Sequence, residues 1–262
     1  MKISIIGSGN IGSAFISGLL RNEGITPGDI CLTDIIQDAL TPFAATGIRT
    51  MQDNVEAVKN ADVVVLCVKP FLICDVIKEI VPSLTDDALI VSFAAGVTLN
   101  QLTLAAGKRP LFRVIPNTAM AICQSMTCIA MSDNTNTNHQ NIILNLFACV
   151  GKALIIDETL MDAATVIASC GTAFALRYLR ATMSAAVEIG FRPAIAEVMI
   201  AQTMLGAALL VSELGNHPEV EIDKVTTPKG ITIKGLAAME QAGFSLAAKQ
   251  GIYAAFDKII LK

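Results

Sequence analysis

The chain has 262 residues and a formal net charge of −4, and 53% of its residues are hydrophobic while 16% are charged. Its length allows one large domain or two modest ones, and its charged fraction lies below the ~25% that is usual for soluble domains. An acidic chain without a run of lysine or arginine lacks the positive surface that nucleic acid requires, so we expect no nucleic-acid partner.

The apolar surplus of this composition has to be covered. The charge-free stretch 163–176 is interrupted by Gly171 and is shorter than the ~20 residues that span a bilayer. The N-terminus shows no cleavage site of the signal-peptide kind. We therefore expect a cytoplasmic protein without membrane contact, whose apolar excess lies in an interface between subunits. The seven cysteines form no C-x-x-C pair and the chain has two histidines, which predicts free thiols and no metal site.

The N-terminal half alternates short β-branched runs with helical patterns, which is typical of a parallel sheet with crossover helices. The run 62–68 is apolar after its aspartate, as expected for a strand that is buried on both faces. The sequence thus predicts an α/β fold that begins with a Rossmann-type domain. Strands are predicted at residues 3–6, 29–32, 62–68, 88–93, 111–115, 126–131 and 153–156, and helices at 11–21, 37–46 and 138–150.

The first predicted strand leads directly into a G-x-G-x-x-G motif, residues 7–12, and the motif opens the first helix. In a dinucleotide-binding site the first glycine permits the tight turn, the second lets the backbone approach the pyrophosphate, and the third lets helix and strand pack closely. The phosphates then lie on free N–H groups at the positive end of the helix dipole. The alternative is a plain strand–turn–helix with incidental glycines. The predicted cofactor contacts in this motif are Gly7, Ser8, Gly9, Asn10 and Ile11.

Asp34 stands at the end of the second predicted strand, about 20 residues beyond the motif, where NAD-binding folds place an acidic residue on the ribose hydroxyls. A carboxylate there repels a 2′-phosphate, and residues 35–37 include no lysine or arginine to replace it. The sequence therefore favours NADH over NADPH. The alternative is that Asp34 caps the next helix.

The character of the chain changes near residue 158. Residues 161–214 are rich in Ala, Met and Leu and read as two long apolar helices with a break at 190–193, and further helices follow a polar segment at 225–230. We expect a dinucleotide-binding domain at 1–158 and an all-helical domain at 159–262. Because the second domain is too apolar to face water alone, we predict that it dimerises.

Five further motifs occur in one order along the chain, and together they resemble those of the pyrroline-5-carboxylate reductase family. Each is moderately specific, and the resemblance covers nearly the whole chain. They are D-N-V-E-A at 53–57, V-K-P at 68–70, S-F-A-A-G-V-T at 92–98, R-V-I-P-N-T at 113–118 and V-T-T-P-K-G-I-T at 225–232.

The resemblance implies a Rossmann domain followed by a helical dimerisation domain, and reduction of the cyclic imine L-1-pyrroline-5-carboxylate to L-proline by NAD(P)H. It implies a homodimer or a higher oligomer, with a substrate pocket completed by both subunits. Thr232 would hydrogen-bond the ring nitrogen and is the candidate catalytic residue. By resemblance the dinucleotide contacts are Gly7, Gly9, Asn10, Asn54, Val68, Lys69 and Pro70, the nicotinamide end is lined by Ala95, Gly96, Pro116 and Asn117, and the substrate is held by Thr227, Gly230 and Thr232.

Several observations leave alternatives open. Residues 226–228 also read as a helix start, with threonine as the cap and proline in the first turn, a reading compatible with an anion site, and Lys69 also reads as a solvated loop charge. Thr172 and Lys229 stand where the family usually has proline and glycine, and Arg177 and Arg180 share one face of a helix that is usually apolar. A reductase of another small keto or imino acid remains an alternative function, although residues 161–214 hold no lysine or histidine as proton donor. A non-catalytic dinucleotide-binding sensor is the other alternative.

Overall fold

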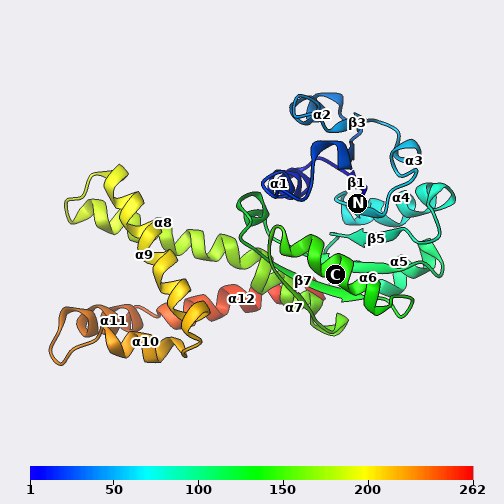
Figure 1. The fold of residues 1–262 in the computed structure, drawn as a ribbon. Helices are drawn as coiled ribbons and strands as arrows, with labels where there is room; N and C mark the ends of the chain where they lie inside the picture. The colour runs from blue at the N-terminus through cyan, green and yellow to red at the C-terminus, as the bar shows by residue number, and fades with distance from the viewer. Residues whose placement is uncertain (262) are drawn as a thin grey trace. The chain divides into compact units, whose positions relative to one another are not determined.

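The structure, a computed structural model, describes residues 1–261. Its first unit is built on an eight-stranded sheet in the order β3-β2-β1-β4-β5-β6-β7-β8 (Figure 1). All neighbouring strands run parallel except β6 and β7, which are antiparallel. The strands are β1 (Ile3–Ile6), β2 (Ile30–Thr33), β3 (Arg49–Met51), β4 (Val63–Leu66), β5 (Leu89–Ser92), β6 (Leu111–Ile115), β7 (Ser125–Met131) and β8 (Gly151–Ile155).

Helices connect these strands and cover both faces of the sheet. The α-helices of this part are α1 (Asn10–Leu19), α2 (Gln37–Ala44), α3 (Asn54–Ala57), α4 (Ile73–Ile80), α5 (Leu99–Ala106), α6 (Thr137–Ala148) and α7 (Met161–Ala164). Short 3₁₀ turns lie at Pro27–Asp29, Pro70–Leu72, Val81–Ser83, Thr118–Ile122 and Glu158–Leu160, and a π-helical turn at Thr165–Cys170 follows α7.

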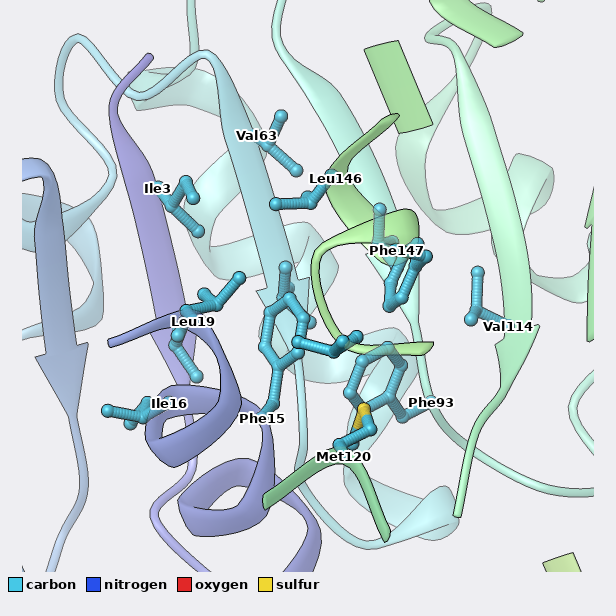
Figure 2. Packing of buried hydrophobic residues seen from close by; sticks show 14 of the residues in the cluster. Ile3, Phe15, Ile16, Leu19, Val63, Phe93, Val114, Met120, Leu146 and Phe147 are labelled. Carbon is cyan, nitrogen blue, oxygen red and sulfur yellow. The ribbon is translucent and has the colours of Figure 1, made fainter. Parts of the chain in front are cut away.

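Each face of the sheet has its own apolar core, and β4 contributes to both. Val63 and Val65 point into the core under α1 and α6, whereas Val64 and Leu66 point into the core under α4 and α5. Figure 2 shows the first core, in which Phe15 of α1 meets Phe93 and Phe147. The three ring centroids lie 5.4–5.8 Å apart, within the range of favourable aromatic contacts. The prediction of a strand buried on both faces is confirmed.

The second unit consists of helices. They are α8 (Gly171–Glu188), α9 (Pro193–Leu214), α10 (Pro218–Lys224), α11 (Ile231–Gln241) and α12 (Phe244–Ile260). Among these five helices only Ala196 is buried within the described chain. The expectation of an all-helical C-terminal region is confirmed, and this region has almost no core of its own.

The chain divides into its two compact units after Cys170, and the second unit comprises Gly171–Lys258. The sequence placed the boundary after residue 158. The difference arises because Met161 of α7 and Ala168 of the π-helical turn belong to the apolar core that α4 and α5 cover. The first helical turns after β8 are therefore part of the sheet domain.

Two helical segments, Glu158–Glu188 and α9, are long and apolar enough by length and composition to cross a membrane. The expectation that the stretch 163–176 is too short to span a bilayer is therefore wrong, because the continuous helix extends well beyond residues 163–176. Helices that are apolar on all sides also occur where a soluble protein buries them in a core or interface. The expectation of no membrane contact depends on what covers these helices.

Candidate active site

The residues predicted to hold a cofactor follow the carboxyl ends of six strands, β1 to β6, with Asn54 after β3. The sheet order reverses between β1 and β4, and the turn after β1 and the segment 68–70 after β4 lie on either side of this switch point. Asp34 follows β2, Ala95 follows β5, and Pro116 follows β6. In open α/β sheets the ligand binds outside the carboxyl ends of the strands at the switch point. The fold therefore gathers the predicted cofactor residues at the edge where a dinucleotide is expected.

The three glycines of the motif have three different environments. Gly7 has a φ of +105°, a conformation that favours glycine, and a Cβ there would lie 2.9 Å from the Cys67 carbonyl oxygen. A Cβ on Gly12 would lie 2.2 Å from the carbonyl oxygen of Gly7, so α1 can approach the turn only without a side chain. A Cβ on Gly9 would have no atom within 4 Å.

Gly9 also immediately precedes α1, and no side chain caps the helix there. The free N–H groups of the first turn and the open space above Gly9 fit the phosphates of a dinucleotide. Among the three glycines of the motif, only Gly9 would place a Cβ with no atom within 4 Å, which the alternative of incidental glycines does not explain.

The Asp34 carboxylate holds this turn in place. Its Oδ2 accepts hydrogen bonds from the backbone N of Ser8 at 2.8 Å and from the Ser8 Oγ at 2.6 Å, while its Oδ1 accepts from the backbone N of Ile36 at 3.0 Å. Partial burial acts to raise the pKa of Asp34, but the hydrogen bonds from Ser8 and Ile36 outweigh it and hold the pKa below its ordinary value. The first residue of α2 follows Ile36, which has no side-chain cap, so the alternative that Asp34 caps this helix is wrong.

The lowered pKa of Asp34 predicts an acid-dependent contribution to stability. Since the folded-state pKa is depressed, the stabilisation is present above the unfolded-state value of about 3.9 and is lost as the pH falls through the folded-state value. We expect the difference in unfolding free energy between wild type and Asp34→Asn to be constant near neutral pH and to shrink below pH ~4. Urea denaturation of both proteins between pH 3 and 7 measures it. A difference that does not change with pH would contradict the role of the charged carboxylate.

Asn54 and Lys69 complete the dinucleotide edge. The Asn54 Oδ1 accepts a hydrogen bond of 2.7 Å from the Thr33 hydroxyl at the end of β2, and its Nδ2 donates to Glu79 at 3.4 Å. Asn54 is therefore fixed next to the strand end that precedes Asp34. Lys69 is exposed and begins the 3₁₀ turn that Pro70 opens. Its geometry agrees both with a contact to a phosphate and with a solvated loop charge.

The predicted nicotinamide end lies after β5 and β6. Gly96 is exposed, with a φ of +74°, whereas Pro116 and Asn117 are buried. The side chain of Asn117 accepts from the backbone N of Ala119 and donates to the carbonyl of Ala168, both at 2.9 Å.

One feature of this edge was missed from the sequence. Arg113 on β6 is 2% exposed and pairs with Asp162 and Glu158. The signal was a lone cation inside the apolar run L-F-R-V-I at 111–115, since a buried charge in a strand needs a partner.

The residues predicted to hold the substrate lie in the second unit, Thr227 and Gly230 at the turn before α11 and Thr232 in the first turn of α11. The backbone N of Gly230 donates to the carbonyl of Thr227 at 2.9 Å, and a Cβ on Gly230 would lie 2.4 Å from the Thr227 Oγ1. Lys229 has a φ of +61° within this turn. Gly230, not Thr227, immediately precedes the helix, and no side chain caps it, so the alternative of a threonine cap is wrong. The N–H groups that begin α11 are free to bind an anion.

Two family models match parts of the chain, and several known proteins are similar to it. The model of the family "Pyrroline-5-carboxylate reductase dimerisation" matches residues 158–260, and that of "NADP oxidoreductase coenzyme F420-dependent" matches residues 2–96. Pyrroline-5-carboxylate reductase 1 of Dictyostelium discoideum is 36% identical over 98% of this chain, which spans 49% of that relative's length. Pyrroline-5-carboxylate reductase of Methanosarcina acetivorans is 34% identical over 98% of this chain and 96% of its own length.

A solved structure of high similarity is that of Plasmodium falciparum pyrroline carboxylate reductase with NADP bound. It has a TM-score of 0.90 and 24% identity, and the match covers 99% of this chain and 97% of that one. The expected fold class, an N-terminal Rossmann-type sheet domain followed by a helical dimerisation domain, is confirmed.

Proposed function

Because the chain belongs to the pyrroline-5-carboxylate reductase family, we propose that it reduces L-1-pyrroline-5-carboxylate to L-proline with a nicotinamide dinucleotide. The structural observation that carries the proposal is the phosphate cradle at Gly7–Gly12. A Cβ on Gly9 would have no atom within 4 Å, and no side chain caps the start of α1. The segments that follow β5 and β6 lie at the same edge of the sheet. This edge supplies a place for a nicotinamide beside the cradle.

The chemistry asks little of the protein beyond alignment. A bound reduced nicotinamide supplies a hydride to the imine carbon. The imine nitrogen is basic enough to arrive protonated, so no strong general acid is required, and the main task is to align the two reacting carbons. In the proposal Ala95, Gly96, Pro116 and Asn117 shape the nicotinamide end of the site.

The substrate is held at the start of α11. The free N–H groups there bind its carboxylate, with Thr227 and Gly230 shaping the turn. The hydroxyl of Thr232, in the first turn of the helix, hydrogen-bonds the ring nitrogen and selects its face. In the proposal the pocket is completed by both subunits of a homodimer or a higher oligomer.

For the cofactor we propose a preference for NADH over NADPH. The Asp34 carboxylate is charged at neutral pH, as an ordinary aspartate is, and the hydrogen bonds from Ser8 and Ile36 lower its pKa further. A fixed negative charge repels a 2′-phosphate. The next residues, Ile35 and Ile36, are exposed and apolar and offer no cation. The ratio of kcat/KM for the two cofactors tests this assignment, and a clear preference for NADPH would reject it.

We place the protein in the cytoplasm and its apolar helices in a subunit interface and not in a bilayer. The match of residues 158–260 to a dimerisation family supports this placement. Helix α9 also carries Glu197 and Glu213, and charges inside a membrane-spanning helix are costly.

The experiment that tests the function is an NADH oxidation assay with pyrroline-5-carboxylate, repeated with NADPH and with a small 2-keto acid. We expect turnover with the imine and none with the keto acid. Turnover of the keto acid alone would favour the alternative function, a reductase of another small keto or imino acid. Binding of NADH without turnover of either compound would favour a dinucleotide sensor.

We expect Thr232→Ala to lower kcat by about tenfold or more and to leave the Kd for NADH within about twofold, since one hydrogen bond to the reacting ring is lost. Thr137→Ala, the same change at an exposed residue of α6, is the matched control and should leave both constants unchanged. An equal loss of kcat and NADH affinity in Thr232→Ala would contradict the proposed role.

A further inference from the structure

Arg113 is the one charged side chain buried inside the sheet of the described chain. It lies on β6 between Leu111 and Ile115, which belong to the core under α4 and α5. Its Nη2 donates to Asp162 Oδ1 at 2.6 Å, and its Nη1 lies 3.5 Å from Glu158 Oε1. The arginine side chain is buried, whereas the side chains of Glu158 and Asp162 are 33% and 37% exposed. A buried arginine gains little stability compared with an apolar residue at the same position. A role other than packing is therefore the better explanation for an arginine at this position.

Arg113 is not arranged to bind an anionic ligand. Both of its terminal nitrogens face carboxylates, and these two negative charges exceed its single positive charge. The guanidinium therefore binds two carboxylates of the protein, Glu158 and Asp162, and not a ligand.

Glu158 connects Arg113 to the loop that carries Ala95 and Gly96. The oxygen that faces Arg113 also accepts a hydrogen bond of 2.6 Å from the backbone N of Leu99. Leu99 is the first residue of α5 and follows that loop directly. The contact spans 59 positions of the chain. Through Glu158 the buried arginine fixes the end of the loop against β6.

Asn117 makes the second connection, from the end of β6 to the π-helical turn. It is 8% exposed, and its Nδ2 donates to the carbonyl of Ala168 while its Oδ1 accepts from the backbone N of Ala119. Both polar atoms of the side chain thus already have partners inside the protein. A side chain inserted into a helix ladder is a known cause of local distortion, and π-helical turns are rare and occur often at functional sites.

Arg113 and Asn117 also both bind the segment 162–168, each at a different point. Asp162 lies in α7, immediately before the π-helical turn, and is bound by Arg113, while the turn itself is bound by Asn117. β6 therefore anchors the loop after β5 on one side and the segment 162–168 on the other.

We propose that Arg113 and Asn117 are positioning residues for hydride transfer. They fix the loop 93–98 and the turn Thr165–Cys170 against the end of β6, so that the nicotinamide is held in one orientation. This inference rests on the proposed function, since hydride transfer is the step that it concerns. Small displacements of reacting groups lower rates strongly while binding changes little.

The test is Asn117→Asp, which keeps an acceptor for the N–H of Ala119 but turns a carboxylate oxygen towards the carbonyl of Ala168. We expect kcat with pyrroline-5-carboxylate to fall about tenfold, with the Kd for NADH within about twofold and a primary deuterium isotope effect at or above that of wild type. Asn136→Asp makes the same change at the asparagine that begins α6, where the side-chain oxygen also accepts a backbone hydrogen bond, and it should behave as wild type. Ile143→Val removes one methylene group from the core on the opposite face of the sheet. This variant shows how lowered stability alone affects kcat.

A second pair of variants tests the other connection. Glu158→Ala removes the acceptor for the N–H of Leu99 and should lower kcat about tenfold, whereas Glu158→Gln keeps a carbonyl oxygen there and should retain most of the activity. If Asn117→Asp does not fold, this pair decides the question.

The outcomes separate the two proposals. A wild-type protein that does not turn over pyrroline-5-carboxylate contradicts the proposed function. If wild type is active, unchanged kcat in Asn117→Asp and Glu158→Ala overturns the positioning roles. Equal losses of kcat and NADH affinity in these variants also overturn them, because they would assign the residues to cofactor binding.

Discussion

Gly12→Ala is expected to destabilise the first unit by about 3 kcal/mol or more and to remove measurable NADH binding. The added Cβ would lie 2.2 Å from the carbonyl oxygen of Gly7, 3.2 Å from its carbonyl carbon and 3.3 Å from the Cβ of Cys67. Two of these atoms belong to the backbone and the third to the partly buried side chain of Cys67 at the end of β4, so none can move without disturbing the fold. Helix α1 would have to move away from the turn, which separates Phe15 and Leu19 from their core. Urea denaturation and titration of NADH fluorescence measure the two effects.

Gly9→Ala is the matched control for this prediction. Gly9 has a φ of −63°, which alanine adopts readily, and its Cβ would meet no protein atom within 4 Å. We expect an unchanged unfolding free energy together with a loss of NADH affinity of about 100-fold, because the methyl group occupies the space where the pyrophosphate approaches the backbone. Normal NADH binding by Gly9→Ala would show that the turn is not the phosphate cradle.

Gly9 and Gly12 also show which features of the fold could be predicted from the sequence. The spacing of the glycine motif and its place between a β-branched strand and a helix are local features, and the structure confirms a distinct environment for each glycine. The same holds for strand β4, whose apolar run is continuous, and for strand β6, whose apolar run is interrupted only by Arg113. Strand β3 was missed because its three residues, Arg49–Met51, show neither apolar alternation nor a β-branched run.

Long-range partners could not be predicted in the same way. The pair of Arg113 and Asp162 joins residues 49 positions apart, and no local pattern specifies that contact. The role of Asp34 illustrates the same limit. The sequence weighed a ribose contact against a helix cap, and the structure shows a third use, the bond to Ser8 that holds the turn. The ribose contact stays a prediction, because each carboxylate oxygen can accept more than one hydrogen bond.

The boundary between the units was displaced for a related reason. Composition changes near residue 158, where the apolar helices begin, but packing changes after Cys170. The intervening segment is helical and apolar, yet it is bound to the sheet by Asp162 and by the carbonyl of Ala168. The composition of a segment predicts whether it forms an apolar helix, whereas only its contacts determine which apolar core it packs into.

The second large effect is expected from Ala181→Lys in the helical unit. Ala181 lies on α8 in an apolar groove that α8 forms with α12, next to Tyr178 and opposite Phe244, whose rings lie 5.7 Å apart. A lysine there would stand four residues after Arg177, which lines the same groove, and the two like charges repel on one helix face. In the proposed dimer this groove is covered by the other subunit. Burying an unpaired charge is then strongly unfavourable, and we expect the dimer Kd to rise by about 100-fold or more.

Loss of the dimer should also unfold the helices of this unit. Helices α8, α10, α11 and α12 contain no buried residue in the single chain, and α9 contains only Ala196. A helical unit without a core lacks the burial that offsets the entropy of folding, so its stability depends on subunit concentration. Light scattering should therefore report a monomer for Ala181→Lys, and far-UV circular dichroism a loss of helix. Ala148→Lys, the same change at an exposed position of α6 in the first unit, should remain dimeric and fully helical. If Ala181→Lys stays dimeric with wild-type helix content, the groove between α8 and α12 is not the interface, and the apolar faces of these helices need another cover.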